Sequence, residues 1–434
     1  MRLTPPTSGM TRGIWVLAFL AVLLTAWTTV RETRRWRKAP FADFNNLQTG
    51  GQCLIAGCDP YGFAALNREA ARRHEPKPEI WPMTPVYPPS SLIVLLPFQG
   101  LGWPAAAWLF NGLAGLATAA ACVLLVWSLR IRVWDPAAVP LLAGLVCIPM
   151  VSALEFANPA LLSTALIAIA CVLLLEYFPR RRPLPGSRTR TRLRTFAWIL
   201  LGLALALKPQ LAVGAVVILL WRRNTRPAAA KSCALAIFLL LAGLTAYRLR
   251  LGSFHFLASL RYALWLSAMP GGSSDFANRE SSDFLNIQTT LATIPNISRA
   301  VVNALAFLTT AALAIVALLI GRARGAVSRR PWTMIALAVA ISVLPIYHRG
   351  YDRVIALLLV PAAVELAATH KRLAWLYAAL LTLWIANDTI MSHILKRWLF
   401  TPQTPVEDIV LCAVLLVSLW LASQPASEPG LVAS

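Results

Sequence analysis

A short polar segment follows the first hydrophobic stretch of the chain and carries the first side chains that could do chemistry. It contains Asp43, Asp59, Tyr61 and Tyr87. A carboxylate such as Asp43, placed just beyond a hydrophobic stretch, can remove the proton from an attacking hydroxyl group. Its position alone also allows Asp43 to be a helix cap or the ion-pair partner of the arginines nearby.

The chain that must position these side chains is strongly hydrophobic. Of its 434 residues, 58% are hydrophobic and only 13% are charged, against roughly 25% charged residues in soluble domains. A membrane span needs roughly 20 apolar residues, and the sequence offers about a dozen such stretches. These features predict an all-α polytopic protein embedded in a lipid bilayer.

The net charge of +22 does not indicate nucleic-acid binding. The arginines cluster in short loops between apolar runs, as the positive-inside rule describes, and neither a basic face nor an aromatic platform accompanies them. Four basic loops, at 180–194, 221–231, 321–330 and 370–372, are therefore expected to be cytoplasmic.

These loops predict the path through the membrane. We expect a multi-pass protein of the plasma (inner) membrane with both termini in the cytoplasm. The first hydrophobic stretch is long enough to span the membrane, and no signal-peptide cleavage site follows it. The basic run 31–38 conflicts with this path, because the path places the run on the extracytoplasmic side. We give the four later basic loops more weight than this single run. The expected spans are 13–30, 103–128, 136–154, 159–178, 195–207, 209–221, 229–247, 299–320, 331–346, 354–369, 373–390 and 408–423.

The segment 195–221 is short, yet basic loops flank both of its ends. One crossing would place one loop outside, whereas two half-helices that meet at Lys208-Pro209 keep both inside. Proline breaks a helix, and broken backbone at membrane depth is tolerated where it lines an enclosed cavity. We expect a hairpin there; a single proline-kinked helix with a snorkelling lysine is the alternative.

The remaining organisation is that of a single membrane domain over residues 1–434 without internal repeats. Two outer loops are expected, at 39–90 and 250–298, and the stretch 88–102 is predicted to be an interfacial or re-entrant helix. Cys53 and Cys58 both lie in the first outer loop, where they could pair. Two free thiols are the favoured interpretation.

With this path, polar residues from six stretches of sequence meet on the outer side of the membrane. Ionisable residues at or near membrane depth are costly, so they are functional hypotheses by default. The set consists of Asp43, Asp59, Tyr61, Tyr87, Glu155, Asn158, Lys208, Asn286, Gln288, His348, Arg349, Asp352 and Arg353.

A carboxylate and several cations suit transfer from a lipid-linked sugar phosphate. Lys208, His348 and Arg349 could stabilise the charge of the departing phosphate, while Asp43 acts as the general base. Substrate binding is possible for Tyr87, Glu155, Asn158, Asn286, Gln288 and Asp352. Simpler roles stay open: the tyrosines as interfacial aromatics, Asn286 and Gln288 as loop hydrogen-bonders, His348 as a structural residue, and Asp352 as the partner of Arg349 or Arg353.

No cofactor is expected. The five histidines are scattered without the spacing of metal ligands, and neither an Asp-x-Asp sequence nor a glycine-rich nucleotide loop is present. These absences disfavour a metal site and a soluble nucleotide-sugar, and they favour a donor carried by a lipid.

The ordered motifs resemble glycosyltransferase family 87, a family of the GT-C superfamily. They are Asp43-Phe44, Ala56-Gly-Cys-Asp-Pro-Tyr61, Tyr87-Pro-Pro89, Asn158, Lys208-Pro209, Asn286-Ile-Gln-Thr289 and Tyr347-His-Arg-Gly-Tyr-Asp352. The resemblance covers roughly residues 40–370. The chain departs from the family pattern at Asn45-Asn46-Leu47, at Glu155-Phe156 and at Cys58.

The resemblance implies a GT-C-like bundle of about 12 transmembrane helices and an inverting hexosyltransferase, for example a mannosyltransferase. The implied partners are a polyprenyl-phosphate-sugar donor and a glycolipid or glycan acceptor of the cell envelope on the extracytoplasmic side. Asp43 matches the expected general base, and Lys208 and His348 match cationic positions of the family.

Two other functions fit parts of the pattern. A lipid or solute transporter or flippase also uses broken helices and buried cations, but such proteins often show repeats and bind near mid-membrane. A noncatalytic subunit of envelope assembly would not need polar groups gathered on one side. We therefore expect an enzyme.

Overall fold

The computed structural model describes residues 41–73, 87–177, 187–252, 256–267, 296–323, 325–344 and 350–390, with isolated positions at 16–31, 288–294 and 413–420. Within these ranges the chain forms helices and no strands, which confirms the all-α class.

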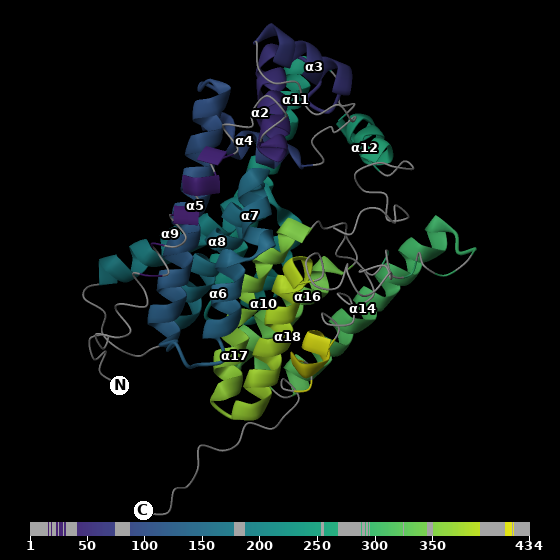
Figure 1. The fold of residues 1–434 in the computed structure, drawn as a ribbon. Coiled ribbons are helices and arrows are strands. Elements are labelled where there is room, and N and C mark those ends of the chain that lie inside the picture. Colours follow the sequence, from purple (N-terminus) through teal and green to yellow (C-terminus); the bar gives the residue numbers. More distant parts are fainter. Residues whose placement is uncertain are drawn as a thin grey trace, which may run out of the picture.

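A bundle of apolar helices makes up the larger part of the molecule (Figure 1). Five helices of the described residues are long and apolar enough to cross a membrane, so the chain is a membrane protein; the expected count of about twelve spans stays a prediction. The bundle consists of α5 (Trp103–Leu129), α6 (Ala138–Val146), α7 (Ile148–Glu155), α8 (Pro159–Val172), η3 (Leu173–Tyr177), α9 (Ser187–Leu207), α10 (Pro209–Trp221), α11 (Arg226–Leu251), α14 (Arg299–Ala323), α15 (Ala326–Arg329), α16 (Pro331–Val343), η4 (Gly350–Leu358), α17 (Val360–Ala367) and α18 (Lys371–Ile390).

Some expected spans are interrupted. The expected span 136–154 is divided between α6 and α7 by Cys147, whose backbone is extended (φ −82°, ψ 165°) ahead of Pro149. The expected span 354–369 begins instead as the tight helix η4 and continues as α17. Hydropathy alone does not locate such breaks, because the residues on both sides of them are equally apolar.

The predicted hairpin at Lys208-Pro209 is confirmed. The helix α9 ends at Leu207, and α10 starts at Pro209 after the non-helical Lys208 (φ −148°, ψ 79°). Near the far ends of the two helices, the Arg194 guanidinium donates to the backbone oxygen of Asn224 over 2.9 Å. Both basic flanks of the hairpin therefore lie at the same end of the bundle, and Lys208 lies at the other end.

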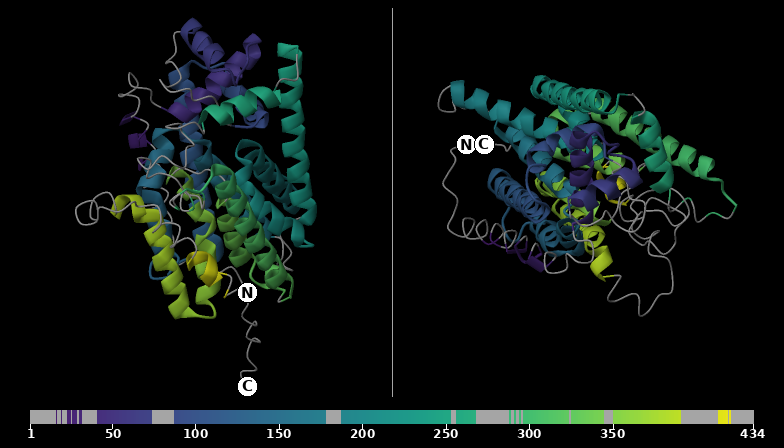
Figure 2. Two further views of the ribbon diagram at one scale, coloured as in Figure 1. Left: turned by 90° about the vertical axis from the view of Figure 1, so that its right-hand side faces the viewer. Right: turned by 90° about the horizontal axis from the view of Figure 1, so that it is seen from above.

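A smaller group of helices stands on that other end. It contains α2 (Ala42–Ala56), α3 (Phe63–Arg72), the last turns of α11 and α12 (Phe256–Ser267) (Figures 1 and 2). Here the favoured interpretation of two free thiols was wrong, since Cys53 and Cys58 form a disulfide with their Cα atoms 4.9 Å apart. The turn that allows this pairing places Gly57 in the left-handed region (φ 80°), directly after α2.

The short helices α4 (Pro89–Val94) and η2 (Leu96–Phe98) lie between the two parts and are too short to span, as expected for 88–102. The break after α9 leaves backbone carbonyls without helical donors. The Ser90 hydroxyl donates to the Ala206 oxygen over 2.8 Å and the Ser91 hydroxyl to the Leu207 oxygen over 2.9 Å. The helix α4 therefore closes the end of α9 beside Lys208.

Gly243 of α11 permits this close approach of α4. A Cβ atom at this position would lie 2.7 Å from the Pro89 Cβ and oxygen atoms. Gly243→Ala is therefore expected to lower the melting temperature in detergent by at least about 3 °C, although alanine forms helix better than glycine by about 1 kcal/mol.

Gly112→Ala in α5 is the matched control for this substitution. A Cβ atom at Gly112 meets nothing within 4 Å, so its melting temperature should stay equal or rise slightly. Equal melting temperatures for the two variants would contradict the role given to Gly243.

Candidate active site

Asn158 joins most of the predicted site residues. It caps the N-terminus of α8, where its Oδ1 accepts a hydrogen bond from the Ala160 amide over 2.7 Å. Its Nδ2 donates to Asp43 Oδ2 over 2.6 Å and to the Tyr87 hydroxyl over 3.2 Å. Its Oδ1 also accepts from Lys208 Nζ over 3.2 Å. One amide group thus separates the carboxylate of Asp43 from the ammonium of Lys208.

Backbone hydrogen bonds hold Asp43 in this position. The amide of Phe41 donates to the Glu155 oxygen and the amide of Asp43 to the Phe156 oxygen, both over 3.2 Å. Phe41 (φ 53°) and Ala157 (φ 48°) both have left-handed backbone conformations, which are uncommon for residues with a side chain. Strain of this kind clusters at functional sites, and here it flanks both Asp43 and Asn158.

Lys208 is buried at the hairpin break and pairs with Asp352. Its Nζ lies 2.5 Å from Asp352 Oδ1, and both side chains are 5% exposed. Asp352 belongs to η4. The start of α10 follows Lys208 immediately, so the positive end of that helix dipole adds to the ammonium charge. The sequence left Asp352 open as a substrate-binding residue or as the partner of Arg349 or Arg353, and the structure pairs it with Lys208.

Asp59 and Tyr61 support the site from outside it. The buried Tyr61 hydroxyl donates to the Tyr87 backbone oxygen over 2.9 Å, and the Asp59 carboxylate accepts from the Tyr61 amide over 3.0 Å. The same carboxylate accepts from Ser259 on α12 over 2.8 Å. Burial raises the pKa of Tyr61 above its usual range, which keeps its hydroxyl a donor. Both residues thus hold Tyr87 in place.

Two other predicted site residues that the structure describes contact partners outside this cluster. Glu155 pairs with Arg31, so Arg31, which follows the first hydrophobic stretch, lies at the same end of the bundle as Asn158. Gln288 Nε2 donates to Asn303 on α14 over 2.5 Å, as a loop hydrogen-bonder would. Asn286, His348 and Arg349 lie outside the described residues.

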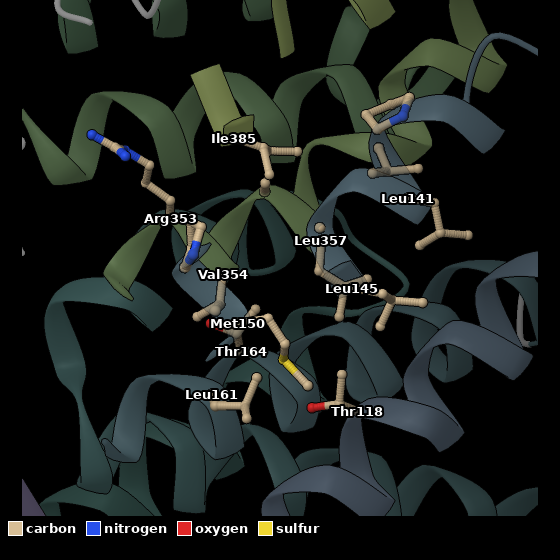
Figure 3. A pocket seen from close by; sticks show the side chains of 15 residues that line it. Thr118, Leu141, Leu145, Met150, Leu161, Thr164, Arg353, Val354, Leu357 and Ile385 are labelled. Carbon is tan, nitrogen blue, oxygen red and sulfur yellow. The ribbon is translucent and has the colours of Figure 1, made fainter. Parts of the chain in front are cut away.

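A cavity lined mostly by apolar side chains lies within the bundle (Figure 3). It is lined by residues of α5, α6, α7, α8, η4, α17 and α18. Arg353, which follows Asp352 in η4, is among them. Gly144 also lines the cavity, and a Cβ atom at this glycine would meet nothing within 4 Å.

The chemistry of the cluster is that of charged and amide groups rather than of metal ligands. Within the described part of the chain, no group of three or more His, Cys, Asp or Glu residues could hold a metal ion. A half-buried carboxylate, a buried ammonium and an amide between them can remove a proton at one side and stabilise an anion at the other.

Sequence reasoning missed the residues that support this arrangement. The hydroxyls of Ser90 and Ser91 bond the end of α9, and the pair of small hydroxylated residues directly after two prolines was the only signal for them. Asn158 was found as a site residue, but its place between the two charged groups depends on contacts between distant parts of the chain.

An apolar helical bundle with a charged site at one end defines an integral membrane protein, and the comparisons with known proteins give its class. Glycosyltransferase family 87 matches residues 86–346, more than half of the chain, so the chain belongs to this family. The matched range includes Tyr87, Asn158 and Lys208; the structure adds Asp43 and Asp352. Neither the curated proteins nor the solved structures gave a match.

Proposed function

We propose that this glycosyltransferase moves a hexosyl group, with mannosyl as the first candidate, from a polyprenyl-phosphate sugar to a glycolipid or glycan acceptor of the envelope. One observation carries the proposal: the Asn158 amide bonds both Asp43 and Lys208. A base and a cation separated by a single amide group suit a reaction in which a hydroxyl loses its proton while a phosphate leaves.

The proposed step is a single displacement that inverts the anomeric carbon. Asp43 takes the proton of the acceptor hydroxyl, whose oxygen forms the new bond to the anomeric carbon. The bond from that carbon to the phosphate oxygen breaks, and its electron pair leaves with the polyprenyl phosphate. Lys208 stabilises the charge that develops on the phosphate, with His348 and Arg349 as further candidate cations.

Asp352 must give way to the donor in this scheme. Its carboxylate lies 2.5 Å from Lys208 Nζ, at a position where an unpaired buried ammonium would be costly. A phosphate that binds Lys208 replaces one anionic partner with another. Tyr87 and Asn158 remain to position the sugar.

The proposed orientation places the site on the extracytoplasmic face of the plasma membrane and both termini in the cytoplasm. Arg194 and Asn224 meet at the end of the hairpin opposite Lys208, and the surrounding loops are arginine-rich. Positively charged loops of this kind stay on the cytoplasmic side.

A transporter is the second candidate, and the broken pair α9 and α10 favours it. Transport sites generally lie near mid-membrane between repeats. The cluster of Asp43, Asn158 and Lys208 lies instead where α2 meets the end of the bundle, which suits an enzyme better.

The purified protein, assayed with a panel of polyprenyl-phosphate sugars and octyl glycosides as acceptors, tests the proposal. We expect one donor to yield a product whose mass is that of the acceptor plus one hexosyl unit. Failure of every donor and acceptor pair, together with uptake of a lipid or sugar into proteoliposomes, would support the transporter.

The cavity beside η4 is the proposed place for the first isoprene units of the donor. Gly144 lines this cavity, and a Cβ atom at Gly144 would meet nothing within 4 Å. Gly144→Leu should therefore narrow the cavity and raise KM for the long-chain donor by about tenfold through lost apolar burial. The KM for a farnesyl-phosphate sugar should rise by a similar factor, because its short chain consists of these first isoprene units.

Gly112→Leu in α5 is the control, because Gly112 does not line the cavity and also has open space beside it. It should leave KM for both donors unchanged. An unaltered KM in Gly144→Leu would place the lipid chain elsewhere.

A further inference from the structure

Asn46 of α2 is a buried polar residue that the proposed reaction does not use. Its side chain is buried, with 5% of the residue exposed, and its Oδ1 has no hydrogen-bond partner within the part of the chain that the structure describes. A buried amide oxygen is costly to leave without a donor. An orphaned acceptor of this kind calls for an explanation in terms of a missing partner.

Two neighbouring polar side chains of α2 make hydrogen bonds within the protein. Asn45 Oδ1 accepts from the Thr49 hydroxyl over 3.4 Å, and Gln48 Nε2 donates to the Leu101 oxygen over 3.2 Å. These contacts hold α2 together and against the segment after η2. Gln48 Oε1 also has no hydrogen-bond partner within the described part of the chain, but Gln48 is five residues from Asp43 and does not share its face of the helix, whereas Asn46 is three residues away.

The position of Asn46 relates it directly to Asp43. Residues three apart in a helix lie on one face, with their Cβ atoms about 5–6 Å from each other. The N-terminus of α2, with Asp43, is fixed to Asn158, and the helix then runs away from the bundle (Figure 1). Asn46 thus lies one turn beyond Asp43, on the side away from Lys208.

This placement favours the acceptor over the donor. The donor phosphate belongs beside Lys208, and in a single displacement the acceptor approaches the anomeric carbon from the opposite side. Its reacting hydroxyl lies at Asp43. A side chain one turn farther out on the same helix face then meets another group of the acceptor molecule.

We propose that Asn46 accepts a hydrogen bond from a second hydroxyl of the acceptor, next to the hydroxyl that reacts at Asp43. The acceptor is then a sugar or another polyol with neighbouring hydroxyls rather than a lipid with a single alcohol. Asn46 is a specificity-determining residue in this scheme. The inference rests on the proposed function and adds to it a residue that recognises the acceptor.

The test uses the octyl glycoside that the wild-type protein glycosylates fastest and its analogues that each lack one ring hydroxyl. One analogue should lose transfer entirely, because it lacks the reacting hydroxyl. A neighbouring analogue should lose about tenfold in kcat/KM, the worth of one hydrogen bond of ordinary strength.

Asn46→Leu should abolish that tenfold discrimination by lowering kcat/KM for the parent glycoside to the value of the analogue. Its KM for the donor should stay within about twofold, and its melting temperature should not fall, because the substitution removes a polar group without a partner. Gln48→Leu is the control, and it should keep the discrimination of the wild type.

Two results would overturn the inference. One is a wild-type protein that, apart from the reacting hydroxyl, does not distinguish the analogues from the parent. The other is an Asn46→Leu variant that retains the discrimination. In both cases the proposed function stands as long as Asp43→Asn removes transfer, so the two failures can be told apart.

Discussion

Asp43→Asn is expected to lower the turnover number by about 10²–10⁴-fold, the contribution of a general base, and to leave KM for the donor within about twofold. Asparagine keeps the size of the side chain and can still bond the Asn158 amide that Asp43 bonds over 2.6 Å. It cannot take a proton from the acceptor hydroxyl. Initial rates at saturating donor, with product detected by mass, measure the effect.

Asp59→Asn is the matched control, because the Asp59 carboxylate has a structural role outside the cluster. It accepts hydrogen bonds from Tyr61 and Ser259, so its loss should lower the melting temperature and leave turnover within a few fold. Near-normal turnover in Asp43→Asn would remove Asp43 from the proposed mechanism. A large loss in both variants with equal destabilisation would reduce Asp43 to a structural role.

The sequence predicted the parts of the site that depend on local features. Proline after Lys208 and the basic flanks of 195–221 predicted the hairpin, because a break and a charge pattern are properties of one short segment. Polar residues that follow apolar runs predicted Asp43 and Asn158 for the same reason. The helical class followed from composition and hydropathy alone.

The pairing of these residues could not be predicted in the same way. Lys208 and Asp352 are 144 positions apart, and Arg349 and Arg353 were equally reasonable partners for Asp352 from their nearness in sequence. Glu155 pairs with Arg31, which follows the first hydrophobic stretch. Charge counting alone did not decide at which end of the bundle Arg31 lies. The disulfide of Cys53 and Cys58 depends on the turn at Gly57, whose geometry the composition does not specify.

Lys208→Met is expected to have two separable effects. Loss of the ammonium should reduce turnover by about 10²–10³-fold, the usual worth of one group that stabilises developing negative charge. The same substitution leaves the Asp352 carboxylate, whose side chain is 5% exposed, without its ammonium partner. Breaking a buried ion pair from one side costs about 3–5 kcal/mol, so the melting temperature should fall as well.

The double variant Lys208→Met/Asp352→Asn separates chemistry from stability. Removing both charges of a buried pair is often neutral for stability, so its melting temperature should return close to that of the wild type. Its turnover should stay as low as that of Lys208→Met, because the Lys208 ammonium is still missing from the phosphate site. If turnover recovers together with stability, Lys208 acts only as the counter-ion of Asp352. The phosphate would then need another cation, and His348 and Arg349 are the candidates.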